Sequence, residues 1–215
     1  MNLNSFFLPW WSKLILKIFL SRIPFKNFIF KKLGIFKHGD MDSVEYLMKI
    51  FEGHLNRSEL SFEQLKNKTI LEIGPGNSIG TALLAASLSA KSFLIDSDFF
   101  ASRSVYFYKS LHRELLKRGL NPPIINKELN INSLLSSCNS KYFINGTESF
   151  KRISDNSVDF IFSQAVLEHV DKMEFKTFLL ETKRVLSKSG ICSHRVDLTD
   201  HLDGGLNNLR FSERV

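Results

Sequence analysis

A glycine-rich segment, Thr69-Ile-Leu-Glu-Ile-Gly-Pro-Gly-Asn-Ser-Ile-Gly80, contains the first residues whose types and spacing suit ligand binding. Gly74 permits a tight turn, and Gly76 allows the backbone to approach a ligand closely. Asp96 lies 22 positions after Gly74, at the end of the next predicted strand. A carboxylate there can accept hydrogen bonds from both hydroxyls of a ribose. The order of strand, loop, helix, strand and acid therefore predicts a site for a nucleoside-containing cofactor.

Two cofactors fit this pattern, a nicotinamide dinucleotide and S-adenosylmethionine. Glu72 stands two residues before Gly74, where its charge would repel a pyrophosphate but attract the ammonium and sulfonium groups of S-adenosylmethionine. The glycines are spaced Gly-x-Gly-x-x-x-Gly, which differs from the dinucleotide motif Gly-x-Gly-x-x-Gly. The segment Asp155–Val170 has no counterpart in the dinucleotide motif. These features favour S-adenosylmethionine over NAD.

Three segments, taken together, resemble the class I S-adenosylmethionine-dependent methyltransferases. They occur in the same order and at matching distances: Leu71–Gly80, Asp96 and Asp155–Val170. The resemblance covers about residues 69–197. Further segments resemble a subgroup found with bacterial surface-polysaccharide and O-antigen genes. These segments are Leu8-Pro-Trp-Trp11, Leu33–Met41 and Asp200–Ser212.

The resemblance implies a cofactor site for S-adenosylmethionine at the start of the domain. In this family Glu72, Gly74 and Gly76 would flank the amino-acid part of the cofactor, and Asp96 would hold the ribose. One departure from the family pattern is Ser78, which stands at the position of a third glycine.

Four further positions are carried over from the family. Thr147 stands where the family places an acid near the adenine amine, so that contact would pass to Thr147, to Glu148 or to backbone. Ser163 and Gln164 would end the fourth strand beside the reactive methyl.

The family also adds a sixth strand and an antiparallel seventh strand to the sheet. This sequence reaches Val215 soon after its fifth predicted strand, so we expect the C-terminal strands to be missing.

Methyl transfer to an oxygen nucleophile also needs a base whose pKa lies near neutrality. Candidates follow the fourth and fifth predicted strands, at the edge where open α/β sheets bind ligands. We exclude His54 because it precedes the predicted fold. The spacing within His194–His201 would accommodate a divalent metal, but we predict none, and structural roles for these side chains stay open. The candidates are His169, His194, Asp197 and His201.

Apolar runs that alternate with helical patterns predict the fold class. Short apolar strands between helices of 10–17 residues indicate an α/β, Rossmann-like, doubly wound and mostly parallel sheet. A helix is expected to begin at Asp42, and another to run over residues 171–186 with Gly190 just past its end. The predicted strands are residues 69–73, 92–96, 141–145, 158–163 and 191–197.

The net charge of +7 is concentrated in the first 39 residues, which contain seven Lys or Arg and no Asp or Glu. The remaining 22 basic and 22 acidic residues balance, which argues against a nucleic-acid-binding face on the main domain. Two cysteines are too few for a disulfide framework, so we expect a cytoplasmic location.

The basic, aromatic-rich segment predicts a helical N-terminal arm over residues 1–56, followed by a methyltransferase domain over residues 57–215. Trp10, Trp11 and several Ile and Phe residues alternate with lysines. The arm would serve either as a lid packed on the domain or another subunit, or as a peripheral contact with the inner face of the membrane. The sequence leaves both interpretations open.

Taken together, these observations predict a methyltransferase that O-methylates a sugar or surface-glycan precursor. The alternatives are a small-molecule or lipid methyltransferase at the membrane surface, and an inactive methyltransferase-like binding domain. Which molecule is the acceptor, which of its atoms is methylated and the oligomeric state are not predicted.

Overall fold

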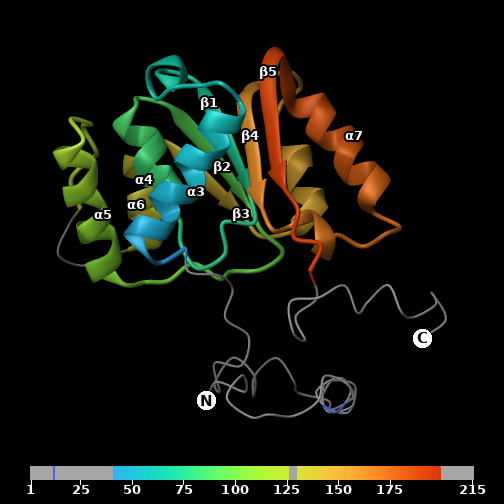
Figure 1. Ribbon diagram of the computed structural model, residues 1–215, viewed down its shortest axis with the longest axis horizontal. Helices are drawn as coiled ribbons and strands as arrows, with labels where there is room; N and C mark the ends of the chain where they lie inside the picture. The colour runs from blue at the N-terminus through green and yellow to red at the C-terminus, as the bar shows by residue number, and fades with distance from the viewer. Residues whose placement is uncertain (1–11, 13–40, 126–129, 200–215) are drawn as a thin grey trace. The chain divides into compact units, whose positions relative to one another are not determined.

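The computed structural model describes Ser12, residues 41–125 and residues 130–199 (Figure 1). The chain divides into two compact units, residues 38–196 and a second unit made of residues 1–37 and 197–215. Only Ser12 and residues 197–199 of the second unit are described, so the predicted arm helix lies outside the described residues. Helix α3, Val44–Arg57, belongs to the first unit, which therefore begins earlier than the predicted domain boundary at residue 57.

The first unit contains a five-stranded sheet in which every neighbouring pair of strands is parallel (Figure 1). The order β3-β2-β1-β4-β5 reverses direction between β1 and β4, so the carboxyl ends of these two strands flank a topological switch point. This arrangement confirms the predicted doubly wound, Rossmann-like fold. The strands are β1 Thr69–Ile73, β2 Lys91–Ile95, β3 Ser140–Phe143, β4 Val158–Gln164 and β5 Leu186–Arg195.

Two hydrophobic cores form on the two faces of the sheet, because successive strand residues point to opposite sides. Ile70 and Phe160 belong to the core that includes residues of four helices, whereas Leu71 and Ile161 belong to the core beneath α7. The helices of the first core are α3, α4 Gly80–Ser87, α5 Val105–Lys117 and α6 Ile131–Ser137. The second core is covered by α7 Phe175–Val185 and by η3 Gly146–Arg152.

The first described helix begins one residue later than predicted. Ser43, rather than Asp42, is the N-cap of α3, and its hydroxyl accepts a hydrogen bond from the backbone N–H of Tyr46 at 3.4 Å. The helix then presents Leu47, Phe51 and Leu55 to the core.

No helix within residues 41–125 and 130–199 is long and apolar enough to cross a membrane.

The boundary between α7 and β5 was wrong in the sequence-based prediction. The helix ends at Val185, and β5 begins directly at Leu186, so Gly190 lies inside the strand instead of ending the helix. The pairing of β4 with β5 shifts register between Val158 and Phe160. A Cβ at Gly190 would lie 2.9 Å from the carbonyl oxygen of Val158, which explains the glycine: it permits close backbone approach at the irregularity.

Candidate functional site

The glycine loop after β1 is held by backbone geometry. Gly74 and Gly76 have φ angles of +73° and +60°, which glycine adopts readily. The Gly74 N–H donates to the carbonyl oxygen of Ile95 at 2.8 Å. A Cβ on Gly74 would lie 2.3 Å from Cγ2 of Val166, so the segment after β4 closes directly onto this loop. Gly74 is therefore required both by the turn and by its contact with Val166.

Asp96 is fixed at the carboxyl end of β2 through both its backbone and its carboxylate. Its N–H donates to the carbonyl of Phe143, and its own carbonyl accepts from the N–H of Gly146. The carboxylate accepts from the N–H of Gly76 at 3.1 Å and from the N–H of Ser97 at 2.8 Å. The structure thus connects the predicted ribose-binding acid directly to the second glycine of the loop.

Glu72 is a buried acid directly before the glycine loop. Its side chain is 2% exposed, and Oε2 has no hydrogen-bond partner among the described residues. Burial raises the pKa of Glu72 to about 8; the side chain of Thr81 acts in the opposite direction and the charge of Asp96 in the same direction. A buried acid with one free oxygen fits a ligand that brings a cation, as the ammonium of S-adenosylmethionine would.

Ser78 replaces a glycine of the family pattern because it has a structural task. Its side chain is buried, and its hydroxyl donates to the carbonyl oxygen of Met41 at 2.7 Å. The same oxygen accepts from the N–H of Gly80 at 3.3 Å. Ser78 therefore links the glycine loop to the segment that precedes α3.

Thr147 and Glu148 lie in η3, directly after Gly146, whose N–H bonds Asp96. The hydroxyl of Thr147 donates to Glu174 at 3.4 Å, and the exposed carboxylate of Glu148 forms an ion pair with Lys151. The structure places both residues beside the carboxyl end of β2. Their contact with an adenine stays a prediction.

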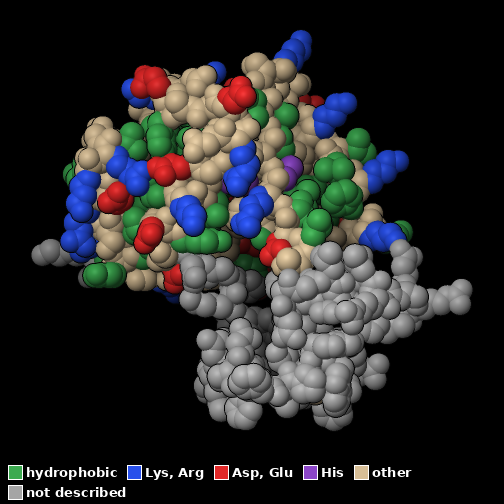
Figure 2. All heavy atoms as spheres, viewed as in Figure 1, with side chains coloured by type: hydrophobic (Ala, Val, Ile, Leu, Met, Phe, Trp, Pro, Cys, Tyr) green, Lys and Arg blue, Asp and Glu red, His purple; other side chains and the backbone are tan. Residues whose placement is uncertain are grey.

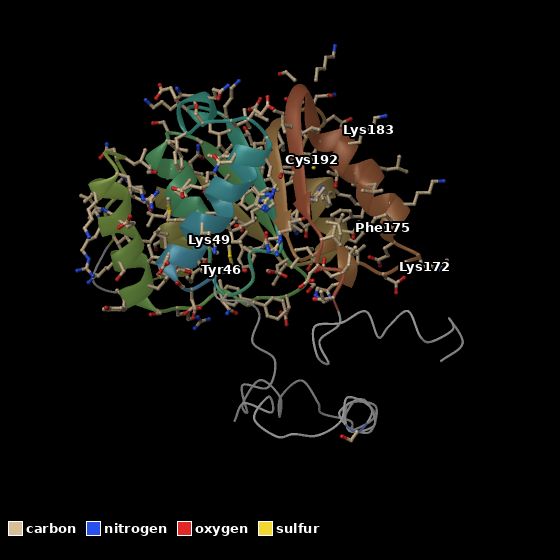
Figure 3. All side chains as sticks on the ribbon, viewed as in Figure 1. Tyr46, Lys49, Lys172, Phe175, Lys183 and Cys192 are labelled. Atoms are coloured by element: carbon tan, nitrogen blue, oxygen red, sulfur yellow. The ribbon has the colours of Figure 1, made fainter. Side chains whose placement is uncertain are left out.

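Ser163 and Gln164 end β4, and the structure joins Ser163 to one of the predicted bases. Ser163 is fully buried, and its Oγ lies 2.7 Å from Nδ1 of His194 on β5. Nε2 of His194 lies 2.9 Å from Sγ of Cys192, which Figure 3 shows on β5 beside α7. Burial lowers the pKa of His194, which favours the neutral form of its ring. Both ring nitrogens have protein partners, and base catalysis by His194 would require one of them to be released.

The other three predicted bases, His169, Asp197 and His201, lie in different parts of the chain. His169 is exposed in η4, Leu167–His169, and its backbone N–H donates to the carbonyl of Val166 at 2.9 Å. Asp197 accepts from the N–H and hydroxyl of Thr199 and belongs to the second unit. His201 lies outside the described residues.

The sequence argument missed His54. This residue was set aside as preceding the fold, but it lies fully buried on α3, and its Nδ1 is 2.8 Å from Oγ of Ser193 on β5. A signal was present in the sequence: His54 shares one helix face with Leu47, Phe51 and Leu55. That face is the buried one, so the histidine had to meet the sheet.

Comparison with known proteins was made by sequence and by structure. A family model described as a methyltransferase domain matches residues 128–193. This stretch, less than half of the chain, is similar to a methyltransferase domain. S-adenosylmethionine is the cofactor that accompanies such a domain, in agreement with the motifs around Glu72 and Asp96. No curated protein matches the sequence.

Three solved structures that resemble the chain are between 15% and 18% identical to it. The DhpI–SAM–HEP complex is 18% identical, with 81% of this chain and 65% of that chain covered and a TM-score of 0.42. PKMT2 from Rickettsia typhi in complex with AdoHcy is 15% identical over 60% and 20% of the two chains, with a TM-score of 0.33. The PH0226 protein from Pyrococcus horikoshii OT3 is 16% identical over 72% and 59%, with a TM-score of 0.41. The chain thus spans less than two thirds of the length of each.

Proposed function

We propose that this protein transfers a methyl group from S-adenosylmethionine to a hydroxyl group of a sugar or surface-glycan precursor. The observation that carries the proposal is the buried Glu72 carboxyl group directly before a glycine loop, whose Oε2 has no hydrogen-bond partner in residues 41–125 and 130–199. An ammonium or sulfonium group would relieve the cost of ionising this carboxyl group. A pyrophosphate would increase that cost.

The residues present fit the cofactor, and their tasks differ. Glu72 would accept hydrogen bonds from the amino group, and Asp96 would hold the ribose hydroxyls while its carboxylate keeps Gly76 in place. Thr147 and Glu148 are proposed to lie near the adenine amine. The cofactor supplies an activated methyl group on a sulfonium, and the protein supplies alignment.

The acceptor is proposed to bind at the carboxyl ends of β4 and β5, beyond Ser163 and Gln164. An acceptor hydroxyl must lose its proton during transfer, and we assign that proton to His169 or to the His194–His201 segment. His169 is exposed at the end of the segment that contacts Gly74 through Val166. His194 is held by Ser163 and Cys192, so substitution of His169 is expected to lower the rate more than substitution of His194.

A sugar acceptor is supported by the resemblance of three segments to the surface-polysaccharide subgroup. A lipid or other small acceptor at a membrane surface is the second candidate, and the basic, aromatic-rich residues 1–39 favour it. On the face drawn in Figure 2, basic and acidic side chains of the described residues are interspersed. Methyl transfer to glycan or to lipid extracts distinguishes the two acceptor classes.

The test incubates the full chain with S-adenosylmethionine labelled in the methyl group and with separate glycan and lipid extracts. We expect label in the glycan fraction, and we expect Glu72→Gln to abolish the transfer. Label in the lipid fraction alone would replace the sugar acceptor by the second candidate. Absence of transfer to any fraction, with the cofactor still bound, would support a binding domain without enzymatic activity.

A further inference from the structure

His54 is a buried histidine on α3 that has no role in the proposed cofactor site. Its side chain has no exposed surface, and its ring lies 5.2 Å from that of Phe162 on β4. Burial lowers the pKa of His54 to about 4, and the nearby Arg57 acts in the same direction. The ring is therefore neutral at pH 7, with one N–H donor and one acceptor nitrogen.

The two ring nitrogens of His54 are in different situations. Nδ1 lies 2.8 Å from Oγ of Ser193 on β5. Nε2 is buried and has no hydrogen-bond partner of good geometry among the described residues. A buried polar atom without a partner costs free energy, and proteins keep few such atoms. The burial of Nε2 without a hydrogen-bond partner is therefore unusual.

The side chain of Gln164 also interacts with His54 and raises the pKa of the histidine, whereas the charges of Arg57, His194 and Arg195 lower it. Because Ser193 occupies Nδ1, Nε2 is the nitrogen left to face the Gln164 amide. The backbone around Gln164 is fixed: this residue pairs with Arg195, and the next N–H, of Ala165, donates to the carbonyl of Arg195 at 2.8 Å. The backbone at this strand end is thus hydrogen-bonded, and it is the side-chain amide of Gln164 that interacts with His54.

We propose that His54 is a positioning residue that orients the side-chain amide of Gln164 at the carboxyl end of β4, with Ser193 holding the opposite side of the ring. A small rotation of Gln164 brings its amide into hydrogen-bond geometry with Nε2. The remaining amide atom then faces the end of the strand, where the proposed acceptor binds. The importance of this for methyl transfer rests on the proposed function, but the contact itself does not.

Two substitutions separate the two ring nitrogens. His54→Gln places a side-chain amide near the position of Nε2, whereas His54→Asn places one near the position of Nδ1. We expect the side-chain amide resonances of Gln164, assigned by their loss in Gln164→Glu, to stay at their wild-type positions in His54→Gln and to move in His54→Asn. Leu55→Ala, a neighbouring buried truncation on α3, serves as the control and should leave them in place.

A reciprocal measurement covers the case in which His54→Asn does not fold. The 15N resonance of Nε2 of His54 is recorded in wild type and in Gln164→Ala, where the histidine itself is intact. A change in Gln164→Ala supports the proposal. An unchanged Nε2 resonance, or amide resonances of Gln164 that respond equally to His54→Asn and Leu55→Ala, would overturn it.

Kinetics then connect the contact with the proposed reaction. Once a methylated acceptor is identified, His54→Asn is expected to raise the KM for the acceptor or to lower kcat, with S-adenosylmethionine affinity unchanged. In His54→Gln, KM and kcat should be close to their wild-type values. If no transfer occurs in wild type while the NMR contact is present, the proposed function fails and the positioning contact stands. If transfer occurs and the NMR contact is absent, the positioning role fails alone.

Discussion

The carboxyl edge of the sheet has two halves that are built differently. At the ends of β1 and β2, backbone N–H groups hold the site: Gly76 and Ser97 donate to Asp96, and Gly74 donates to Ile95. At the ends of β4 and β5, side chains hold it, through the pairs Ser163–His194 and His54–Ser193. The carboxylate of Asp96 bonds residues one and 20 positions away, whereas the side-chain pairs of the second half join residues 31 and 139 positions apart.

Burial also affects the two halves differently. It raises the pKa of Glu72 in the first half and lowers the pKa of His54 and His194 in the second, so neutral forms are favoured in both. Within the described part of the chain, Glu72 also keeps a buried oxygen without a hydrogen-bond partner directly before the glycine loop. The first half would thus suit the cation of the proposed cofactor, and the second half would present neutral histidine rings toward the proposed acceptor.

The largest expected effect concerns Glu72 in the protein without cofactor. Its pKa rises from 4.5 to about 8 on folding, so its contribution to stability is full below pH 4.5 and is lost as the pH rises toward 8. Glu72→Gln should remove this loss, which is on the order of 3–5 kcal/mol. Urea unfolding at pH 5 and pH 8 should show the variant more stable than wild type at pH 8. An equal pH dependence in both proteins, with Glu63→Gln as the surface control, would contradict the burial of this acid.

Gly74→Ala tests the contact between the two halves. A positive φ at a non-glycine residue costs roughly 1–2 kcal/mol, and overpacking against Val166 adds about 1–3 kcal/mol. Chemical denaturation should show a loss of this size. Val166→Ala in the same chain should restore the packing part but not the backbone part. A double variant no more stable than Gly74→Ala would show that Val166 does not press on the loop.

Asp96→Ala is expected to weaken S-adenosylmethionine binding by roughly 1–3 kcal/mol, because hydrogen bonds to a charged group are lost. Asp96→Asn keeps an acceptor oxygen and should lose less. Calorimetry on both variants, with His194→Ala as a control from the second half, measures the difference. Unchanged affinity in Asp96→Ala would exclude this residue as the ribose ligand.

The smallest effect is expected from deletion of residues 1–37, which lie outside the unit that contains both halves. Cofactor affinity should stay within a few-fold of wild type. Flotation with anionic liposomes then decides between the two interpretations of the arm. Binding by the intact chain but not by the deleted one supports membrane contact, and equal behaviour supports a lid.

The positions of the first-half residues could be predicted because their motifs follow one another along the chain, while their contacts with a cofactor stay a prediction. A glycine pattern, a buried acid and Asp96 follow one another along β1 and β2, so their spacing alone indicates the site. The order of strands and helices likewise predicted the fold. The start of β5 was misplaced because Gly190 was interpreted as a helix end, whereas it serves a close approach to Val158.

The second half could be predicted only in part, since its partners meet through the fold. His194 was expected at the carboxyl end of the sheet, but its partners Ser163 and Cys192 could not be inferred from spacing. His54 was excluded because its helix precedes the first strand. Only the packing of α3 against the sheet brings His54 to Ser193, and that packing is a tertiary property.

Calorimetric titration of the full chain with S-adenosylmethionine, beside NAD, tests the central claim most directly. Performed at pH 7 in two buffers of different ionisation enthalpy, it also counts protons. We predict saturable binding of S-adenosylmethionine, none of NAD, and release of about one proton, because the cofactor's positive charge ionises Glu72. Proton release should disappear in Glu72→Gln. Binding of NAD, or absence of S-adenosylmethionine binding, would contradict the account.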